Sequence, residues 1–274
     1  MYSDSPWVAH VELPGGLVLD GNRCLRKAEL RPLNGREEEW LAEGRNLPSA
    51  VKVTRLLNSC LVSLDDCPVT SEVVRSLLVG DREYLMLRLR ELTLGDEVKA
   101  VLQCPGCTQR MDVSFRISET PVEERRQTSA VYSVALANRQ VLFRLPSGGD
   151  QEAVLAMEAP SAVNELLRRC VLDDGGQPLE REDRETVIAE MERLAPRVEL
   201  ELDAVCPECG HAFVAPFDTT AFFFDEMRAS RDQLLREFHA LAFYYHWSES
   251  DILSLGRDRR RTYLGLLSEA LRQD

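Results

Sequence analysis

Residues 98–115 read VKAVLQCPGCTQRMDVSF, and residues 198–217 read VELELDAVCPECGHAFVAPF. In each stretch, apolar and polar residues alternate on both sides of a Cys-Pro-x-Cys turn. Alternation with a period of two around a tight turn is typical of a β-hairpin. The sequence therefore predicts two hairpins, each with two cysteines at its tip.

The two cysteine pairs predict one structural zinc site. Zinc in such sites takes four tetrahedral ligands, most often thiolates at about 2.3 Å. A two-residue spacer lets one hairpin tip present two thiolates to one ion, and two tips complete the set. The neighbouring His211 is not needed as a ligand. The predicted ligands are Cys104, Cys107, Cys206 and Cys209.

The 98 residues between Cys107 and Cys206 exceed the short spacers of familiar zinc fingers. An internal duplication explains this spacing, because equivalent tips of two copies can meet at a pseudo-twofold axis. We place the copies at Leu17–Ile117 and Tyr132–Asp218. Each copy has a strand-like run, then helices, then its hairpin, and the second copy is shorter.

Helical spacing predicts the helices of the two copies. In the first copy we expect a helix over Ser49–Leu64, a second beginning at Thr70, and a third after Gly80 with Asp81 as its N-cap. In the second copy the expected helices are Ser161–Leu172 and Asp183–Leu194.

The remaining chain predicts a connector and a helical end. Residues 118–130 are polar and lack an apolar period, as a connector would. After Asp218 the apolar period becomes helical, with a capping-box signature at Ser248–Asp251 and a break at Gly256. The sequence thus predicts an α+β protein, a duplicated helix-plus-hairpin module joined by a zinc-ribbon-like four-cysteine site and followed by a helical extension. Its parts are residues 1–117, 118–130, 131–218 and 219–274.

Composition narrows the class of protein. The formal net charge of −13 repels phosphate, which argues against nucleic acid as a partner. No apolar run is long enough to span a membrane, and the first residues do not resemble a secretory signal. We therefore expect a cytoplasmic protein without a membrane or nucleic-acid partner.

The C-terminal region carries the candidate partner surface. It contains an aromatic cluster and a run of arginines. The aromatic cluster either covers the hydrophobic core or forms a partner surface. The arginine run is either a solvated helix face or a docking patch for an acidic partner. The candidate residues are Tyr244, Tyr245, Trp247, Arg259, Arg260, Arg261 and Tyr263.

Other interpretations of the cysteine pairs stay open. They are plain hairpin cysteines, disulfides formed on oxidation, or a thioredoxin-like redox site. Redox catalysis needs the first cysteine at a helix N-terminus, whereas Thr108–Phe115 alternates like a strand. Cys60 and Cys170 fall at matching places on apolar helices and read as core residues.

No catalytic motif is recognisable. None of the four histidines belongs to a metalloprotease, nucleophile-elbow or phosphate-loop pattern, and the Gly-Gly pairs lack the strand-to-helix context that holds phosphate. We expect no enzyme activity and no small-molecule substrate.

The order of several short motifs resembles a known family. The motifs are LPGG at Leu13–Gly16, LRPLNGREE at Leu30–Glu38, LLNSC at Leu56–Cys60, LLVGDR at Leu77–Arg82, and then the Cys-Pro-x-Cys hairpin. Together they are similar to the baseplate-hub assembly chaperone family of T-even-type phages and its relatives in contractile injection systems. The stretches Tyr244–Leu253 and Arg259–Leu264 also look like segments of tail proteins.

The resemblance implies a role in building a contractile-tail baseplate inside the bacterial host, with hub or spike proteins as partners. It leaves open whether the chain is a transient chaperone or stays in the assembled particle. A zinc-ribbon adaptor in transcription or nucleic-acid binding is the alternative from another class. A thiol–disulfide enzyme is a third.

Overall fold

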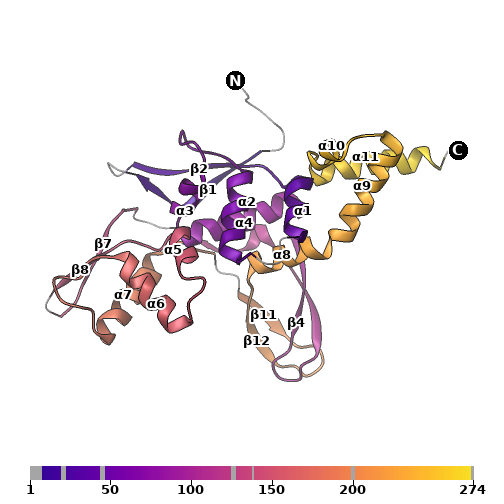
Figure 1. Cartoon of the computed structure of the whole chain (residues 1–274). Coiled ribbons are helices and arrows are strands. Elements are labelled where there is room, and N and C mark those ends of the chain that lie inside the picture. The colour runs from indigo at the N-terminus through magenta and orange to yellow at the C-terminus, as the bar shows by residue number, and fades with distance from the viewer. Residues whose placement is uncertain are drawn as a thin grey trace.

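The computed structural model describes residues 8–19, 23–43, 47–124, 128–137, 139–198 and 201–272. It is a mixed helix and sheet structure, in which small antiparallel sheets and two long ribbons surround a group of central helices (Figure 1).

The first sheet has the order β1-β2-β3 and is entirely antiparallel. Its strands are β1 (Ala9–Leu19), β2 (Arg23–Leu30) and β3 (Leu61–Leu64). Helices α1 (Gly35–Glu43) and α2 (Ser49–Cys60) connect β2 to β3. The predicted helix over Ser49–Leu64 is therefore too long: the run after Cys60 pairs with β2, since an apolar tetrapeptide fits a strand as well as a helix.

The second sheet repeats this order as β7-β8-β9. Its strands are β7 (Tyr132–Ala135), β8 (Gln140–Phe143) and β9 (Val171–Asp173), and helices α5 (Gly148–Ala153) and α6 (Ala159–Cys170) connect the last two. Here too the expected helix ends early, at Cys170. Neither β1 nor β7 was expected as a strand.

The same arginine–carboxylate pair occurs in the connection from β2 to β3 and in the connection from β8 to β9. Arg31 donates to Glu37 and Arg144 donates to Asp150, in each case through two guanidinium nitrogens at 2.6–3.2 Å. The backbone N–H of each arginine donates to the carbonyl of the cysteine that ends the next helix, Cys60 or Cys170. Both cysteines are fully buried, as expected.

Helices α3 (Ser71–Ser76) and α4 (Val79–Leu94) follow the first sheet, and α7 (Arg181–Leu194) follows the second. The expectation that Asp81 caps α4 is wrong: α4 begins two residues earlier, with Leu78 at its N-cap. The buried Asp81 carboxylate instead accepts hydrogen bonds from the N–H groups of Gly15 and Gly16, at 2.6 and 2.9 Å. It thereby holds a turn within β1 against the central helix.

Two ribbons run side by side from the central helices (Figure 1). One is β4 (Glu97–Gln103) with β5 (Arg110–Arg116), and the other is β11 (Glu201–Val205) with β12 (Ala212–Pro216). Both are continuous antiparallel hairpins, as predicted. The expected connector also holds structure: η1 (Ile117–Glu119) is followed by β6 (Val122–Glu123), which pairs with β10 (Arg197–Val198).

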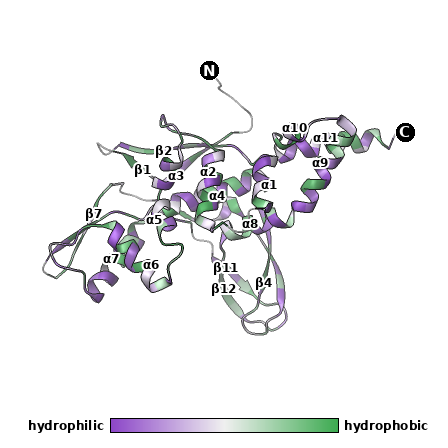
Figure 2. Cartoon of the chain, viewed as in Figure 1, coloured by the Kyte–Doolittle hydropathy of each residue, from purple (hydrophilic) through white to green (hydrophobic). Residues whose placement is uncertain are grey.

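The chain ends in a helical arm. It consists of α8 (Thr219–Ala229), α9 (Arg231–Tyr245), α10 (Glu249–Leu253) and α11 (Arg257–Ala270). In Figure 1, α8 lies against the central helices, and α9, α10 and α11 lie at one end of the molecule. Along these helices hydrophobic and hydrophilic residues alternate, so only part of each helix surface is apolar (Figure 2). Phe223, Phe224 and Met227 of α8 join the core of the first half, while Leu234, Phe238 and Leu241 of α9 form a separate cluster with α10.

The arm meets α1 in the manner in which α3 and α4 meet α5. The N–H of Gly35 donates to the carbonyl of Leu255 at 3.2 Å, and the N–H of Gly148 donates to the carbonyl of Leu77 at 2.9 Å. Isolated β-bridges join Asn34 to Gly256 and Ser147 to Leu78. Helix α11 begins directly after Gly256 and helix α4 directly after Leu78, so the two contacts share one backbone geometry.

Candidate metal centre

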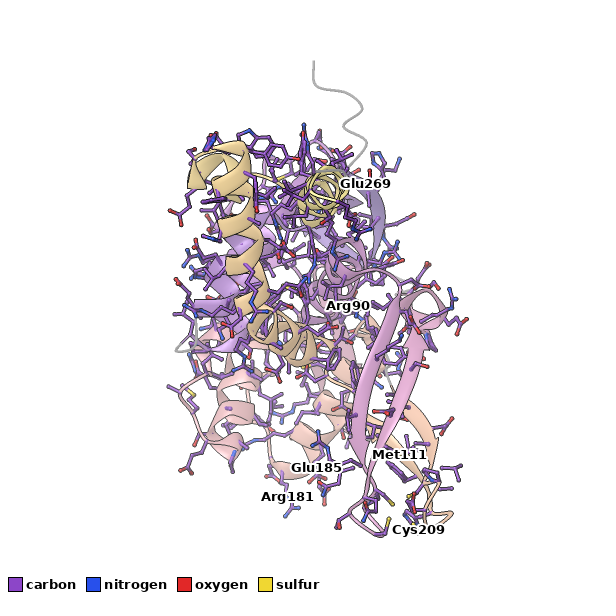
Figure 3. All side chains as sticks on the ribbon, turned by 90° about the vertical axis from the view of Figure 1, so that its right-hand side faces the viewer. Arg90, Met111, Arg181, Glu185, Cys209 and Glu269 are labelled. Atoms are coloured by element: carbon purple, nitrogen blue, oxygen red, sulfur yellow. The ribbon has the colours of Figure 1, made fainter. Side chains whose placement is uncertain are left out.

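The tips of the two ribbons meet and bring four thiols together. Cys104 and Cys107 come from the β4–β5 turn, and Cys206 and Cys209 come from the β11–β12 turn. The four Sγ atoms all lie within 4.8 Å of one another. Figure 3 shows Cys209 at the far end of the ribbons.

Both tips have the same backbone. The N–H of Cys104 donates to the Gln109 carbonyl and its carbonyl accepts from the Thr108 N–H, each at 2.9 Å; Cys206 makes the same two bonds with His211 and Gly210. Thr108 and Gly210 both have a left-handed backbone, with φ of 62° and 71°. This shared turn points two cysteine side chains of each ribbon toward the other ribbon.

The sulfur spacing fits a tetrahedral metal ion. Sγ of Cys104 lies 3.7 Å from Sγ of Cys209, and Sγ of Cys107 lies 3.6 Å from Sγ of Cys206. Four thiolates at 2.3 Å from a zinc ion stand about 3.8 Å apart. A disulfide needs about 2.05 Å, and all eight cysteines are free. The predicted ligand set therefore converges as expected, in a geometry suited to a metal.

Local hydrogen bonds divide the thiols electrostatically. The backbone N–H of Cys209 lowers the pKa of Cys206 to about 7, helped by the N–H of Glu208. The backbone N–H of Gln109 lowers the pKa of Cys107. The hydrogen bonds of Cys107 to Cys209 and Cys206, together with its partial burial, outweigh this and raise the pKa of Cys107 to about 12. A cation bound between the thiols would displace the proton that Cys107 holds at neutral pH.

His211 takes no part in the cluster. Its imidazole lies beside Gly106 of the other tip, where a Cβ on Gly106 would approach it to 3.2 Å, and it stacks on Phe213. It packs one ribbon against the other.

The ribbons are anchored at their bases by an apolar cluster. Val98 and Ile117 are buried there against Leu87 of α4. Phe217 meets Phe115 edge-on at 5.1 Å between ring centroids and contacts Phe222 at 4.9 Å. The two ribbons are therefore joined at both ends, by aromatic packing at the body and by cysteines at the tip.

The candidate partner residues are half-buried, exposed or, in one case, buried. Tyr245, Trp247 and Tyr263 pack on one another, with ring centroids 4.8–5.9 Å apart, whereas Tyr244 is 46% exposed. Arg259 and Arg261 are exposed on α11.

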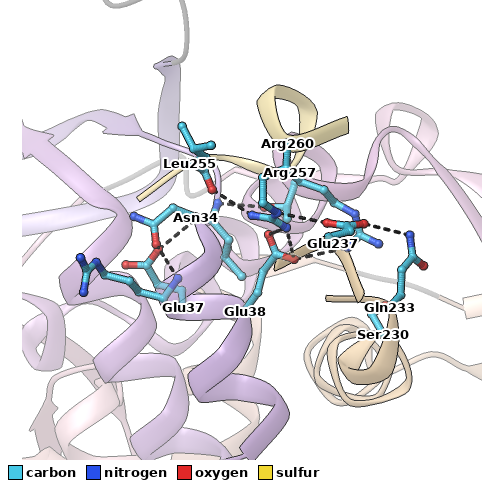
Figure 4. A network of polar contacts seen from close by, with 12 residues as sticks. Asn34, Glu37, Glu38, Ser230, Gln233, Glu237, Leu255, Arg257 and Arg260 are labelled. Atoms are coloured by element: carbon cyan, nitrogen blue, oxygen red, sulfur yellow. Dashed lines mark hydrogen bonds and ion pairs between the residues drawn. The ribbon is translucent and has the colours of Figure 1, made fainter. Parts of the chain in front are cut away.

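Arg260 is a correction to the predicted surface, because it is fully buried. Its guanidinium donates to both carboxylate oxygens of Glu38, at 2.8 and 2.9 Å, and to Glu237 at 3.1 Å (Figure 4). Glu38 and Glu237 were not singled out from the sequence. A run of arginines contains no signal for which member turns inward; α11 packing against α1 and α9 decides it.

Among the described residues, no helix is both long and apolar enough to cross a membrane.

Comparison with known proteins gives one match. A family model described as T4 bacteriophage base plate protein matches residues 17–172, more than half of the chain. The matched region begins near the end of β1 and contains β2, β3, the first ribbon, β7, β8 and most of β9. No curated protein and no solved structure matches. The resemblance inferred from the short motifs is thus confirmed, and the chain belongs to the T4 bacteriophage base plate protein family.

Proposed function

We propose that this chain is a zinc-clipped, non-enzymatic component or assembly chaperone of a contractile-tail baseplate that binds hub or spike proteins. Membership of the base plate protein family supports a structural role in the baseplate. The hub or spike partner, action in the host cytoplasm and persistence in the particle extend that role.

The proposed zinc site is supported by the convergence of four thiols from two ribbons. Cys107 and Cys206, one from each ribbon, are 99 positions apart in the sequence. A bound ion would join the two halves of the chain at a point remote from their main packing. Such a clip would hold both ribbons as one rigid projection, which suits a protein that must present a fixed surface during assembly.

We also propose that the two halves are diverged copies of one module. Three parallels support this: the order of strands in the two sheets, the Arg31–Glu37 and Arg144–Asp150 pairs, and the matching cysteine turns. The division into residues 1–117, 118–130, 131–218 and 219–274 follows from it, with β6 and β10 bridging the connector and the second copy.

Zinc content tests the metal assignment. Protein purified under reducing conditions should contain one zinc ion per chain, measured by inductively coupled plasma mass spectrometry. Cys206→Ser should lose most of it, while Cys24→Ser, which alters a thiol outside the cluster, should retain it. Zinc-free wild-type protein would contradict the assignment.

Mass spectrometry of assembled particles beside cleared lysate tests the baseplate role. A resident component should be present in purified baseplates at a fixed ratio to other baseplate proteins, and a chaperone should be found only with partly assembled hub or spike proteins. Absence from both fractions would contradict the proposed function.

A further inference from the structure

Among the described residues, one backbone corner occurs at the start of three helices. A leucine precedes the N-cap of each helix, and an arginine lies four positions after the N-cap. We call these the inserting corners: Leu77, Leu78 and Arg82 at α4; Leu179, Glu180 and Arg184 at α7; Leu255, Gly256 and Arg260 at α11. All three N-caps have extended backbone, with φ between −74° and −60° and ψ between 151° and 176°. In two corners the arginine side chain donates to the carbonyl of the leucine, at 3.0 Å for Arg184 and 2.9 Å for Arg260.

Two of the inserting corners are covered by a second kind of corner from the same chain. In both contacts the glycine that begins a helix donates its N–H to the carbonyl of the leucine, at 2.9–3.2 Å. The residue before that glycine forms a β-bridge with the N-cap. We call these the receiving corners: Ser147-Gly148 of α5 covers the corner at α4, and Asn34-Gly35 of α1 covers the corner at α11. Arg82 and Arg260 lie fully buried in these contacts.

Each receiving helix also brings a carboxylate to the inserting side. Glu38 of α1 accepts hydrogen bonds from Arg260 at 2.8 and 2.9 Å. Glu152 of α5 pairs with Arg75 of α3 at 2.8 Å and accepts a hydrogen bond from the hydroxyl of Thr54 in α2. Both contacts thus combine a backbone bridge with an arginine–carboxylate pair, and such pairs fix orientation and discriminate against other partners.

The receiving corners share a sequence signature that has a physical basis. A Cβ on Gly148 would collide with the guanidinium of Arg82, and a Cβ on Gly35 would lie 2.9 Å from the backbone of α10. Glycine is therefore required where the receiving helix begins, because the inserting corner packs directly against it. Residues 31–37 and 144–150 both read Arg-x-x-(Asn/Ser)-Gly-x-(Glu/Asp), in which the arginine binds the last carboxylate.

The inserting corner at α7 faces an open groove instead of a receiving corner. The groove has a volume of about 600 Å³, and Asn164, Leu179 and Arg184 are among the residues that line it. Arg184 is exposed and, within the part of the chain that the structure describes, no backbone N–H donates to the Leu179 carbonyl. Asn164 corresponds to Thr54, because each lies six residues before the cysteine that ends its helix, and Thr54 contacts the receiving helix at the α4 corner. In Figure 1, α6 and α7 lie at the opposite end of the molecule from the arm.

We propose that the inserting corner at α7 binds a receiving corner of another baseplate protein, one that carries the signature Arg-x-x-(Asn/Ser)-Gly-x-(Glu/Asp). The glycine N–H of the partner donates to the Leu179 carbonyl, and a carboxylate near the start of the partner helix accepts from Arg184. This occupant is inferred from the two covered corners, because they show what the same backbone binds. Both receiving corners of this chain are taken by its own helices, so the partner is a different protein. This assignment rests on the proposed baseplate role and names one partner by its chemistry.

Two matched pairs of variants separate the groove from its surroundings. Arg184→Glu reverses a charge in the groove, whereas Arg193→Glu reverses one nine residues further along α7, outside the groove lining. Asn164→Trp fills the groove, whereas Val163→Trp adds the same side chain at the preceding position of α6, outside the lining. All four replaced side chains are exposed, so the variants should fold, and thermal melts followed by circular dichroism check this.

The probes are the other baseplate proteins encoded with this chain, each purified at full length and measured by biolayer interferometry against the immobilised wild type and variants. We expect a protein that carries the signature to bind. Its affinity should fall at least about tenfold with Arg184→Glu and with Asn164→Trp, and stay within about twofold with Arg193→Glu and Val163→Trp. Replacing the signature glycine of that protein by alanine should also weaken binding, because the added Cβ would meet the inserting corner.

The assignment is overturned if no protein with the signature binds, or if Arg184→Glu and Arg193→Glu weaken binding equally. Self-association of this chain alone, measured by analytical ultracentrifugation and lost in Arg184→Glu, would give the corner to a second copy and also overturn it. Recovery of the wild-type chain in particles is measured separately. If the chain enters baseplates but no protein with the signature binds, the corner assignment fails and the proposed function stands. If the chain is absent from baseplates and from partly assembled complexes, the proposed function itself fails.

Discussion

Replacing Arg260 tests how much of the arm's attachment depends on one buried cation. In Arg260→Met, the carboxylates of Glu38 and Glu237, which are 3% and 7% exposed, lose three hydrogen bonds from the guanidinium. Glu38 keeps only Arg257 at 3.8 Å, and Glu237 keeps Gln233 at 3.1 Å. Breaking a buried ion pair by removing one partner costs about 3–5 kcal/mol, so we expect a loss in that range.

The loss should depend on pH in a defined direction. Burial raises the pKa of Glu38 above its ordinary value, although Arg260 and Arg257 oppose this. A carboxyl group whose folded pKa exceeds its unfolded value binds protons more readily when folded, so its contribution to stability improves as pH falls toward that pKa. Without Arg260 the pKa should rise further, and the variant should recover part of its stability at pH 5 relative to pH 8.

Urea unfolding followed by far-ultraviolet circular dichroism measures this loss from the midpoint and the slope. Arg261→Met is the matched control, because its exposed neighbouring side chain should change stability by less than about 0.5 kcal/mol. Combining Arg260→Met with Glu38→Gln and Glu237→Gln should restore part of the stability. Equal effects of the two methionine variants, or a loss independent of pH, would refute this account of the arm.

Three further predictions concern other parts of the fold. Chelation of the proposed zinc should lower the free energy of unfolding by up to about 4.7 kcal/mol, the entropic value for a cross-link closing about 100 residues, and thermal melts of chelated wild-type and Cys206→Ser protein should then coincide. Gly148→Ala should cost about 1–3 kcal/mol, because a Cβ there would collide with the guanidinium of the buried Arg82. Gly149→Ala, whose Cβ would lie 3.6 Å from the nearest atom, should be neutral or stabilising, and chemical denaturation measures both variants. Burial raises the pKa of Asp150, but Arg144, the Ser147 N–H and Arg169 outweigh it and hold that pKa well below its usual range. Its stabilisation is therefore present above the unfolded pKa near 3.8 and lost as pH falls below it, so Asp150→Asn should cost about 1.5–3 kcal/mol at pH 7 and progressively less in acid titrations of unfolding.

The clustering of the cysteines accounts for how the two halves are joined. The ribbons contact the body through aromatic side chains and contact each other at the thiols. A metal ion would therefore join them at the tips, far from the apolar cluster at their bases. Loss of the ion should leave the sheets and central helices folded, because their cores are remote from the tips.

Several features followed from the sequence alone because local pattern decides them. Alternation around Cys-Pro-x-Cys is sufficient for a hairpin, so both ribbons and all four converging cysteines could be named from it. The family was also recognisable from short motifs. One of them, LPGG at Leu13–Gly16, ends in a glycine with a positive φ at the turn within β1. The N-caps Thr70 and Ser248 lie where local capping chemistry predicts them.

Tertiary structure decided what local pattern leaves ambiguous. Leu61–Leu64 suits a helix or a strand, and only pairing with β2 selects the strand. Asp81 suits an N-cap, but it instead accepts hydrogen bonds from the N–H groups of Gly15 and Gly16, 66 and 65 positions away. Arg259, Arg260 and Arg261 are chemically identical, and burial of the middle one depends on carboxylates from α1 and α9 that meet only in the folded chain. The physical reason is common to all three: hydrogen-bond and charge partners distant in sequence choose among states that nearby residues leave nearly equal in energy.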